Sequence, residues 1–216
     1  MRCLAPVLLA IAALMPAQEL RVTVYDGYAP AEITDGFSKW AKDTLRRDVT
    51  VKVTVVGNNN EAHNAIRTGS ADVCVATSNM LGSERYKLIT GKLVQPIDSA
   101  PLSNYADLMP SLKKPGFLVA DGKQYGVPMN WGFAFADLAK AGEPWAVAEP
   151  TEGTLGYVDS FVLSTSLSAE LKPLAMAYID YTISPAAQAV LARGCGGMSV
   201  NIKTKALLTD DEAKAA

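Results

Sequence analysis

Histidine is almost absent from this chain, since His63 is the one histidine among 216 residues. A serine–histidine–aspartate triad needs a histidine beside a nucleophile and an acid, and His63 has no such partner in the sequence. Histidine, cysteine and carboxylate residues also do not cluster at the spacing of a metal site. We therefore expect no catalytic triad, no metal and no cofactor, and we interpret His63 as a surface residue of a short helix.

An excess of positive charge is also missing. The chain has 20 basic and 22 acidic residues, so its net charge is −2. Nucleic acids and anionic membrane surfaces attract basic proteins, and we expect neither as a partner. Apolar residues make up 49% of the chain and charged residues 19%, which is typical of a globular protein with one sizeable domain or two small ones.

Long hydrophobic runs are absent except near the start of the chain, from Cys3 to Met15. This run is too short to span a membrane as a helix. It follows a basic residue, Arg2, and precedes Ala17, which is the pattern of a secretory signal peptide. We expect cleavage after Ala17 and a soluble exported protein, because Cys3 does not lie in a lipobox.

Cysteine is scarce, and Cys74 and Cys195 are the two that would remain after signal cleavage. An oxidising compartment permits these two residues to pair in a disulfide. The alternative is that they stay apart, because Cys74 lies within an apolar strand, where a cysteine can serve as a small core residue, and Cys195 lies in a glycine-rich loop. Both interpretations stay open at the level of sequence.

The first half of the chain alternates β-branched stretches with helical patterns. The expected strands are 20–25, 49–56 and 72–76. Two helices are expected, of which the first begins at Pro30 and the second spans 61–68. In the first helix a buried stripe is predicted at every fourth residue, namely Ile33, Phe37, Ala41 and Leu45. The order strand–helix–strand–helix–strand predicts an α/β fold with a parallel sheet. In such folds ligands bind outside the carboxyl ends of the strands.

The last third of the chain adds one strand and two helices. An apolar run predicts a strand at 155–163, and a helix with one apolar face follows at 168–183. A second short helix begins with Ser184 as its N-cap and Pro185 at its first position, and it stops at Gly194. Residues 203–216 are polar, and we expect them to be partly frayed.

Polar residues stand where the predicted strands end. The turn after the first strand is Asp26-Gly27-Tyr28, and the third strand is followed by Thr77, Ser78 and Asn79. In the strand at 155–163, Tyr157 and Asp159 lie two residues apart and therefore on the same face. An aromatic ring beside a carboxylate suits an organic cation.

Two other roles for Asp159 remain open. Backbone amides at the mouth of a strand can satisfy a carboxylate without any ligand. Asp159 and Asp26 can also be considered as the paired carboxylates of an exported enzyme, although no nucleophile motif accompanies them.

Several segments resemble the periplasmic polyamine-binding proteins, which are the spermidine/putrescine receptors of ABC importers. Residues 152–160 are similar to the E-G-x-x-x-x-x-D-S segment of that family, whose aspartate binds a substrate amine and whose aromatic residue, often tryptophan, stands where Tyr157 stands here. Tyr28-Ala29-Pro30 matches the second half of the family's first turn, whereas Asp26-Gly27 departs from its Asn-Trp. The resemblance continues through 71–75, 77–78, 93–98, 104–105 and 125–132.

The resemblance implies capture of a polyamine in the periplasm for an ABC permease in the inner membrane. The implied ligand-binding residues are Asp159, Tyr157, Tyr28, Asp26, Thr77, Ser78 and Asn79. In this role the protein performs no chemistry on its ligand, so we expect that it is not an enzyme.

The resemblance also implies that most of a second lobe is missing. Family members continue through a whole second lobe, whereas residues 136–144 here already resemble the end of that lobe. We thus divide the chain into a signal peptide (1–17), the main part of the first lobe (18–135), a shortened connection (136–150), and a return strand with C-terminal helices packed on the same lobe (151–216).

The fold expected from this division is a single α/β lobe of a periplasmic binding protein, with a mixed, mostly parallel sheet flanked by helices. An interaction module or an inactive remnant of a receptor is the alternative function. The loss of a lobe would expose apolar residues, namely Trp131, Phe133, Phe135 and Trp145, and would favour self-association through that face.

Overall fold

The computed structural model describes residues 17–130, 151, 158–195 and 199–215. The strands are β1 (Gln18–Val24), β2 (Val49–Val55), β3 (Val73–Thr77), β4 (Val94–Gln95), β5 (Val119–Ala120), β6 (Lys123–Gln124), β7 (Val127–Asn130) and β8 (Asp159–Ser164). The helices are α1 (Ala31–Trp40), α2 (Asn59–Arg67), α3 (Ser78–Leu81), α5 (Lys172–Thr182), α6 (Pro185–Cys195) and α7 (Asp210–Ala215), with short 3₁₀ turns between them. None of the helices in these ranges is both long and apolar enough to cross a membrane.

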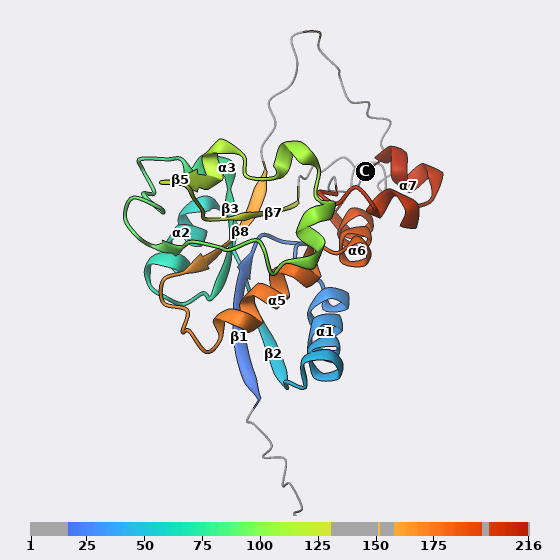
Figure 1. The fold of residues 1–216 in the computed structure, drawn as a ribbon, viewed down its shortest axis with the longest axis horizontal. Helices are drawn as coiled ribbons and strands as arrows, with labels where there is room; N and C mark the ends of the chain where they lie inside the picture. The colour runs from blue at the N-terminus through green and yellow to red at the C-terminus, as the bar shows by residue number, and fades with distance from the viewer. Residues whose placement is uncertain (1–16, 131–150, 152–157, 196–198, 216) are drawn as a thin grey trace, which may run out of the picture.

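One mixed sheet organises the fold, and its strand order is β2-β1-β3-β8-β4, with β7 also paired to β8 (Figure 1). The strands β2, β1 and β3 run parallel, as predicted. By contrast, β8 runs antiparallel to β3, β4 and β7, so the sheet is less parallel than expected. The antiparallel direction brings the first residue of β8 beside the last residue of β3, at the edge of the sheet where a ligand is expected.

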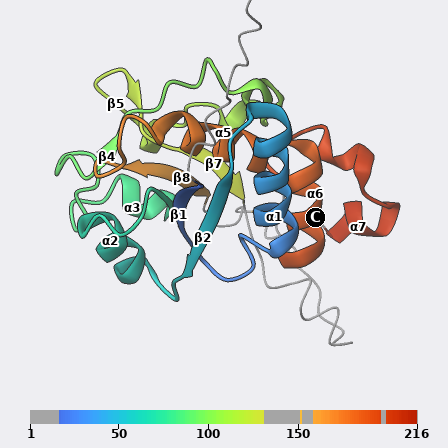
Figure 2. The same cartoon turned by 90° about the horizontal axis from the view of Figure 1, so that it is seen from below.

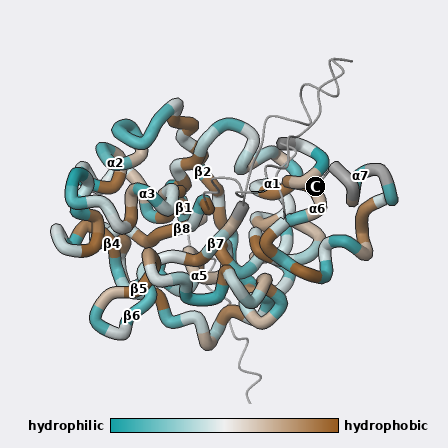
Figure 3. Tube along the Cα trace, turned by 90° about the horizontal axis from the view of Figure 1, so that it is seen from above, coloured by the Kyte–Doolittle hydropathy of each residue, from teal (hydrophilic) through white to brown (hydrophobic). Residues whose placement is uncertain are grey.

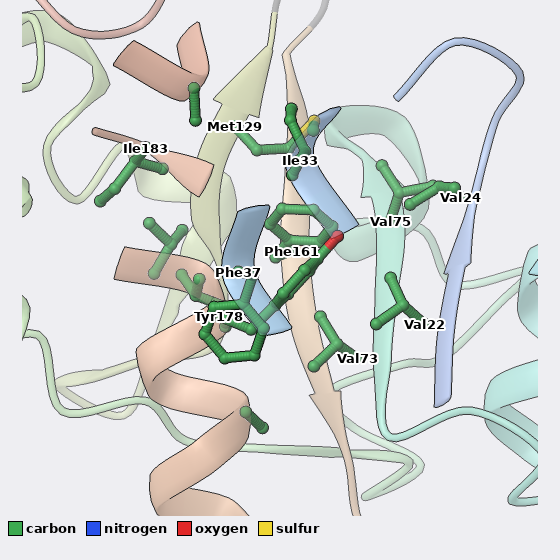
Figure 4. Close-up of a cluster of buried hydrophobic side chains, with 14 of the residues drawn as sticks. Val22, Val24, Ile33, Phe37, Val73, Val75, Met129, Phe161, Tyr178 and Ile183 are labelled. Carbon is green, nitrogen blue, oxygen red and sulfur yellow. The ribbon is translucent and has the colours of Figure 1, made fainter. Parts of the chain in front are cut away.

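Helices cover both faces of the sheet, with α1 and α5 on one side and α2 and α3 on the other (Figure 2). Aromatic rings fill the core beneath α1 and α5, because Tyr178 lies edge-on to Phe37 at 5.2 Å and to Phe161 at 5.8 Å between ring centroids (Figure 4). The tube around α2 is largely hydrophilic, whereas hydrophobic stretches follow the central strands (Figure 3). The α/β class and the mixed sheet flanked by helices are therefore confirmed.

The first helix follows the predicted apolar stripe through three of its four positions. Ile33, Phe37 and Ala41 are buried, but Leu45 is 39% exposed. The helix widens into a π turn over Ala41–Leu45 and ends at Arg46, whose φ is +57°. The wider turn changes the angular spacing of the side chains, so the stripe that a regular helix would keep on one face leaves the core at Leu45.

Polar caps fix two other helices close to the predicted positions. Asn58 is the N-cap of α2, and its Oδ1 accepts hydrogen bonds from the amides of Asn60 (3.0 Å) and Glu61 (3.1 Å). The helix consequently begins two residues before the predicted Glu61. At α6 the Ser184 Oγ accepts a hydrogen bond from the Ala187 amide (3.4 Å), which confirms the predicted cap.

Cys74 is a free and fully buried cysteine within β3. Its Sγ lies 3.8 Å from the carbonyl oxygen of Ala62, and burial raises the pKa of its thiol. The structure therefore has no disulfide between Cys74 and Cys195, and the side chain of Cys195 lies outside the described residues. The interpretation of Cys74 as a small core residue agrees with this environment.

Candidate functional site

A hollow of about 640 Å³ lies at the carboxyl ends of β1, β2 and β3. It is lined by Tyr25, Asp26, Tyr28, Gly57, Asn58, Asn59, Asn60, Thr77, Asn79, Tyr86 and Asp159. Five of the seven residues predicted to bind ligand are among them. Ser78 does not line the hollow, and Tyr157 lies outside the described residues.

Asp159 is the most deeply buried of these polar residues, with 1% of its surface exposed. It is the first residue of β8 and faces Thr77 across the β3–β8 pair. The hydroxyl of Tyr28 donates a hydrogen bond to Oδ2 at 2.6 Å, whereas Oδ1 is buried without a partner among the described residues. The expectation that backbone amides satisfy Asp159 therefore does not describe its environment.

Burial makes Asp159 a weaker acid than usual. Loss of water around the carboxylate raises its pKa from 3.8 to about 6, and the hydrogen bond from Tyr28 acts in the opposite direction. At neutral pH the side chain thus carries a negative charge. One hydrogen bond stabilises this charge, and no cation among the described residues compensates it. A carboxylate in this condition gains most from an added cation.

The turn after β1 holds Tyr28 against Asp159. Gly27 adopts a φ of +79°, which glycine reaches without strain, and its amide donates a hydrogen bond to Asp26 Oδ1 at 3.0 Å. Tyr28 is 8% exposed and lies edge-on to Tyr25, with 6.1 Å between ring centroids. Asp26 is exposed at the rim, so the hollow has an exposed carboxylate in addition to the buried one of Asp159.

Hydrogen-bonded side chains line the side of the hollow next to α2. We call this group the amide wall, and it consists of Tyr25, Asn59, Thr77 and Asn79. The hydroxyl of Tyr25 donates to Asn59 Oδ1, and Asn59 Nδ2 donates to Asn79 Oδ1 at 3.3 Å. Thr77 Oγ1 also donates to Asn79 Oδ1. These bonds fix the side chains relative to one another, so Thr77 and Asn79 belong to a network rather than acting as independent acceptors.

Sequence reasoning predicted Asn79 but missed the other asparagines of this side of the hollow, and it missed Tyr25 and Tyr86. Asn58, Asn59 and Asn60 follow β2, so the rule on the carboxyl ends of parallel strands could have found them. Tyr86 follows α3 in a loop and gives no signal in the sequence. Its hydroxyl donates to Asn60 Oδ1 at 3.2 Å, and its ring lies 5.3 Å from that of His63, which is half-buried.

Ser78 has a supporting position instead of a place in the lining. Its amide donates to the carbonyl of Val158 at 2.8 Å, and its Oγ accepts from the amide of Val158 at 3.4 Å. These two contacts join the end of β3 to the residue before Asp159. Ser78 therefore positions the backbone that carries the buried carboxylate.

The charge of the hollow suits a cation. Among its described lining residues, Asp26 and Asp159 are the two carboxylates, and none is a lysine or an arginine. Arg85 is not among the lining residues. It donates to Asn60 Oδ1 at 3.1 Å, and its guanidinium lies 5.3 Å from the ring centroid of Tyr86. Within the described ranges, no three histidine, cysteine or carboxylate side chains gather in a way that could hold a metal ion.

A family model of bacterial extracellular solute-binding proteins matches residues 52–216. This match covers most of the chain, including β3, β8 and Asp159. The chain belongs to the bacterial extracellular solute-binding proteins. Members of this family are exported, bind a small solute and, in general, work with the permease of an ABC transporter.

Solved structures share the fold of this solute-binding protein. A protein described as a spermidine/putrescine ABC transporter from Listeria monocytogenes matches with a TM-score of 0.73 and 14% identity, over 91% of this chain and 88% of that chain. The spermidine/putrescine ABC transporter substrate-binding protein from Streptococcus pneumoniae matches with a TM-score of 0.67 and 13% identity, over 91% and 87%. Thiaminase I from Bacillus thiaminolyticus matches with a TM-score of 0.61 and 11% identity, over 91% and 90%.

Identities this low show the fold and not the ligand. Proteins that bind maltose share the fold as well. The ligand of this solute-binding protein must therefore be argued from the chemistry of its own side chains.

A larger hollow of about 830 Å³ lies elsewhere on the molecule, between α5 and residues 96–124. Its lining is mostly apolar, and its described charged residues are three lysines and two aspartates, namely Lys114, Lys123, Lys172, Asp98 and Asp180. The smaller hollow is the better candidate for the solute, because it lies at the carboxyl ends of the strands and contains the buried carboxylate of Asp159, whose Oδ1 has no partner among the described residues. The residues predicted to drive self-association, Trp131, Phe133, Phe135 and Trp145, lie outside the described residues.

Proposed function

We propose that this solute-binding protein captures a small organic cation of the polyamine type for an ABC importer. The observation that carries the proposal is Asp159, whose buried Oδ1 has no described partner, in a hollow that is lined by neither lysine nor arginine among the described residues. An ammonium group supplies both the charge and the hydrogen-bond donor that this oxygen lacks. Tyr28 and Tyr157 would offer aromatic faces to the same cation, and Asp26 would suit a second amine.

The resemblance of residues 152–160 to the polyamine receptors supports the same ligand class. We further propose that the mature protein begins after Ala17 and acts in the periplasm. Intact-mass measurement of the exported protein tests the cleavage site, and a mature chain that still begins at Met1 would contradict it. We propose no chemistry on the ligand, because Asp159 accepts a hydrogen bond from Tyr28 and the sequence shows no nucleophile motif.

The proposed affinity is weak because the protein is proposed to consist of one lobe. A hydrogen bond to a charged group contributes about 1.5–3 kcal/mol, and a cation over an exposed aromatic face contributes roughly 0.5–1 kcal/mol. Together Asp159 and two tyrosines would supply about 2.5–5 kcal/mol, which corresponds to a dissociation constant in the millimolar range. A receptor with two lobes surrounds its ligand and gains further contacts from the second lobe.

Calorimetric titration with putrescine and spermidine tests the proposal. We expect millimolar binding by the unmodified protein and no detectable binding by Asp159→Asn, which keeps the shape of the side chain and removes its charge. Asp180→Asn is a matched control, since Asp180 lies outside this hollow and binds Ser103 and Asn104. Equal binding by Asp159→Asn would place the amine elsewhere.

The alternative function is an interaction module or an inactive remnant that has lost solute binding. The same titration separates the two, because a folded protein that binds none of these amines even at tens of millimolar would favour the alternative.

A further inference from the structure

The outer edge of β2 is free of strand partners among the described residues. β2 is the first strand in the order β2-β1-β3-β8-β4, and β1 is the strand that pairs with it there. Its seven residues are Val-Thr-Val-Lys-Val-Thr-Val, with a β-branched residue at every position except Lys52. A long and regular edge of this composition is a template for pairing with another strand.

Backbone hydrogen bonds at both ends of β2 show which residues face the free edge. The carbonyl of Asp48 accepts from Gln18 at 2.9 Å, and the amide of Val56 donates to Val24 at 2.9 Å, so these even-numbered residues point toward β1. Because successive residues of a strand point their N–H and C=O groups to opposite sides, the odd-numbered residues point away from β1. Four valines, at 49, 51, 53 and 55, therefore present their amides and carbonyls along the outer edge.

The sequence of β2 is the same in both directions about Lys52. A strand with this symmetry can pair with a second copy of itself, antiparallel and about a twofold axis, so that like residues meet like residues. In this register Val51 of one copy faces Val53 of the other, and Val49 faces Val55. Hydrogen-bonded pairs then fall on the valines, which are the residues whose backbone groups point outward.

We propose that this edge is a self-association surface, on which β2 of a second copy pairs antiparallel with Lys52 on the twofold axis. The pairing covers Val55, which is 57% exposed in the single chain, with Val49 of the second copy. It also joins the two valine rows into one stripe on the same face of a continuous sheet. This surface differs from the hollow that contains Asp159, so the proposal does not rest on the proposed ligand.

Lys52 limits the strength of the pair. The two Lys52 side chains meet directly across the axis, and like charges in that position oppose pairing. Glu19 on β1 lies 3.5 Å from Lys52 in the same chain and offsets part of this repulsion. We therefore expect a dimer that forms at high protein concentration and that Lys52→Gln strengthens.

Proline at position 53 tests the edge with little effect on the rest of the sheet. The amide of Val53 points away from β1, so Val53→Pro removes a donor of the free edge while the β1–β2 bonds remain. Val53→Thr keeps that donor and serves as the matched control. In sedimentation equilibrium the unmodified protein and Val53→Thr should approach the mass of two chains as concentration rises, whereas Val53→Pro should keep the mass of one.

Cysteine substitutions test the register and do not depend on the proline variant. Lys52→Cys should form an intermolecular disulfide on mild oxidation, because residues on the axis form a non-hydrogen-bonded pair with Cα atoms about 4.5 Å apart, within the range that disulfides span. Thr54→Cys alone should cross-link no more than the unmodified protein, but an equimolar mixture of Thr50→Cys and Thr54→Cys should cross-link as heterodimers. Three results would each overturn the proposal. They are a monomer at every concentration, a dimer that persists in folded Val53→Pro, and cross-linking in another register.

Discussion

Asp159 is both buried and able to carry a negative charge, and in the ligand-free protein burial disfavours that charge. Its position at the start of β8 places it under Tyr28, where it is almost fully buried. The same burial raises the pKa of the carboxyl to about 6, so the charged form destabilises the fold. A residue that costs stability in this way is typical of a binding site, where the ligand later compensates the charge.

Replacing Asp159 with Asn should therefore stabilise the ligand-free protein at alkaline pH. The folded pKa, about 6, lies above the ordinary value of 3.8, so the stability that the neutral side chain contributes is fully present below pH 3.8 and is lost as pH rises through 6. The shift corresponds to ~3 kcal/mol at pH 8. Urea unfolding should show Asp159→Asn more stable than the unmodified protein at pH 8, with little difference at pH 4.

Asp26→Asn is the control for this measurement, since Asp26 is exposed at the rim of the same hollow. It should change the free energy of unfolding by less than about 0.5 kcal/mol at either pH. If Asp159→Asn proved less stable than the unmodified protein at pH 8, a compensating partner for Asp159 would have to exist.

Single residues also mark the limit of sequence reasoning about the site. Asp26, Tyr28, Thr77 and Asn79 were predictable because each follows a parallel strand, and such ends meet at one edge of a sheet. Tyr86 was not predictable, because it reaches the hollow from an irregular loop after α3. Its place depends on the tertiary packing of that loop and on no periodic pattern.

At the scale of elements, α2 connects the fold to the site. Its N-cap Asn58 lines the hollow and also binds the amides of Asn60 and Glu61. Glu61 in turn accepts from the Gly57 amide at 2.8 Å, so both ends of the turn after β2 are held. The start of this helix therefore sets the position of the amide wall.

Asn58→Ala should cost about 1 kcal/mol of the free energy of unfolding, because the first amides of α2 lose their acceptor. Chemical denaturation followed by circular dichroism measures the loss. Asn64→Ala changes the same residue type at an exposed position inside α2, where alanine favours the helix, and it should cost less. Equal losses in the two variants would contradict a capping role for Asn58.

Local patterns gave the elements more reliably than their arrangement. The strands β1, β2 and β3 and the helices α1 and α2 could be predicted because their hydrophobic periods are regular. The direction of β8 could not, since a continuous apolar run is typical of a parallel strand, and β8 has such a run because both of its faces are buried although it pairs antiparallel. The exposure of Leu45 was also missed, because a π turn leaves no mark in the spacing of apolar residues.

At the scale of the whole molecule, the proposed ligand and the proton compete for one carboxylate. An amine binds the charged form of Asp159, whereas acid pH favours the neutral form that binds it less well. Because the folded pKa is about 6, this competition falls within the pH range that an exported protein can meet. Binding of a cation should also lower that pKa and release protons.

We therefore expect putrescine to bind more weakly at pH 5 than at pH 8. Putrescine keeps both charges across this range, so the change reports on the protein. With a carboxyl pKa of about 6, roughly one tenth of Asp159 is charged at pH 5, and the apparent affinity should fall about tenfold. Calorimetry at pH 6 in two buffers of different ionisation enthalpy should in addition detect release of about half a proton for each ligand bound.

Asp26→Asn should keep the pH dependence even if its affinity is lower, because Asp26 is exposed. Affinity that stays constant from pH 5 to pH 8, with no proton release, would mean that the amine does not contact Asp159.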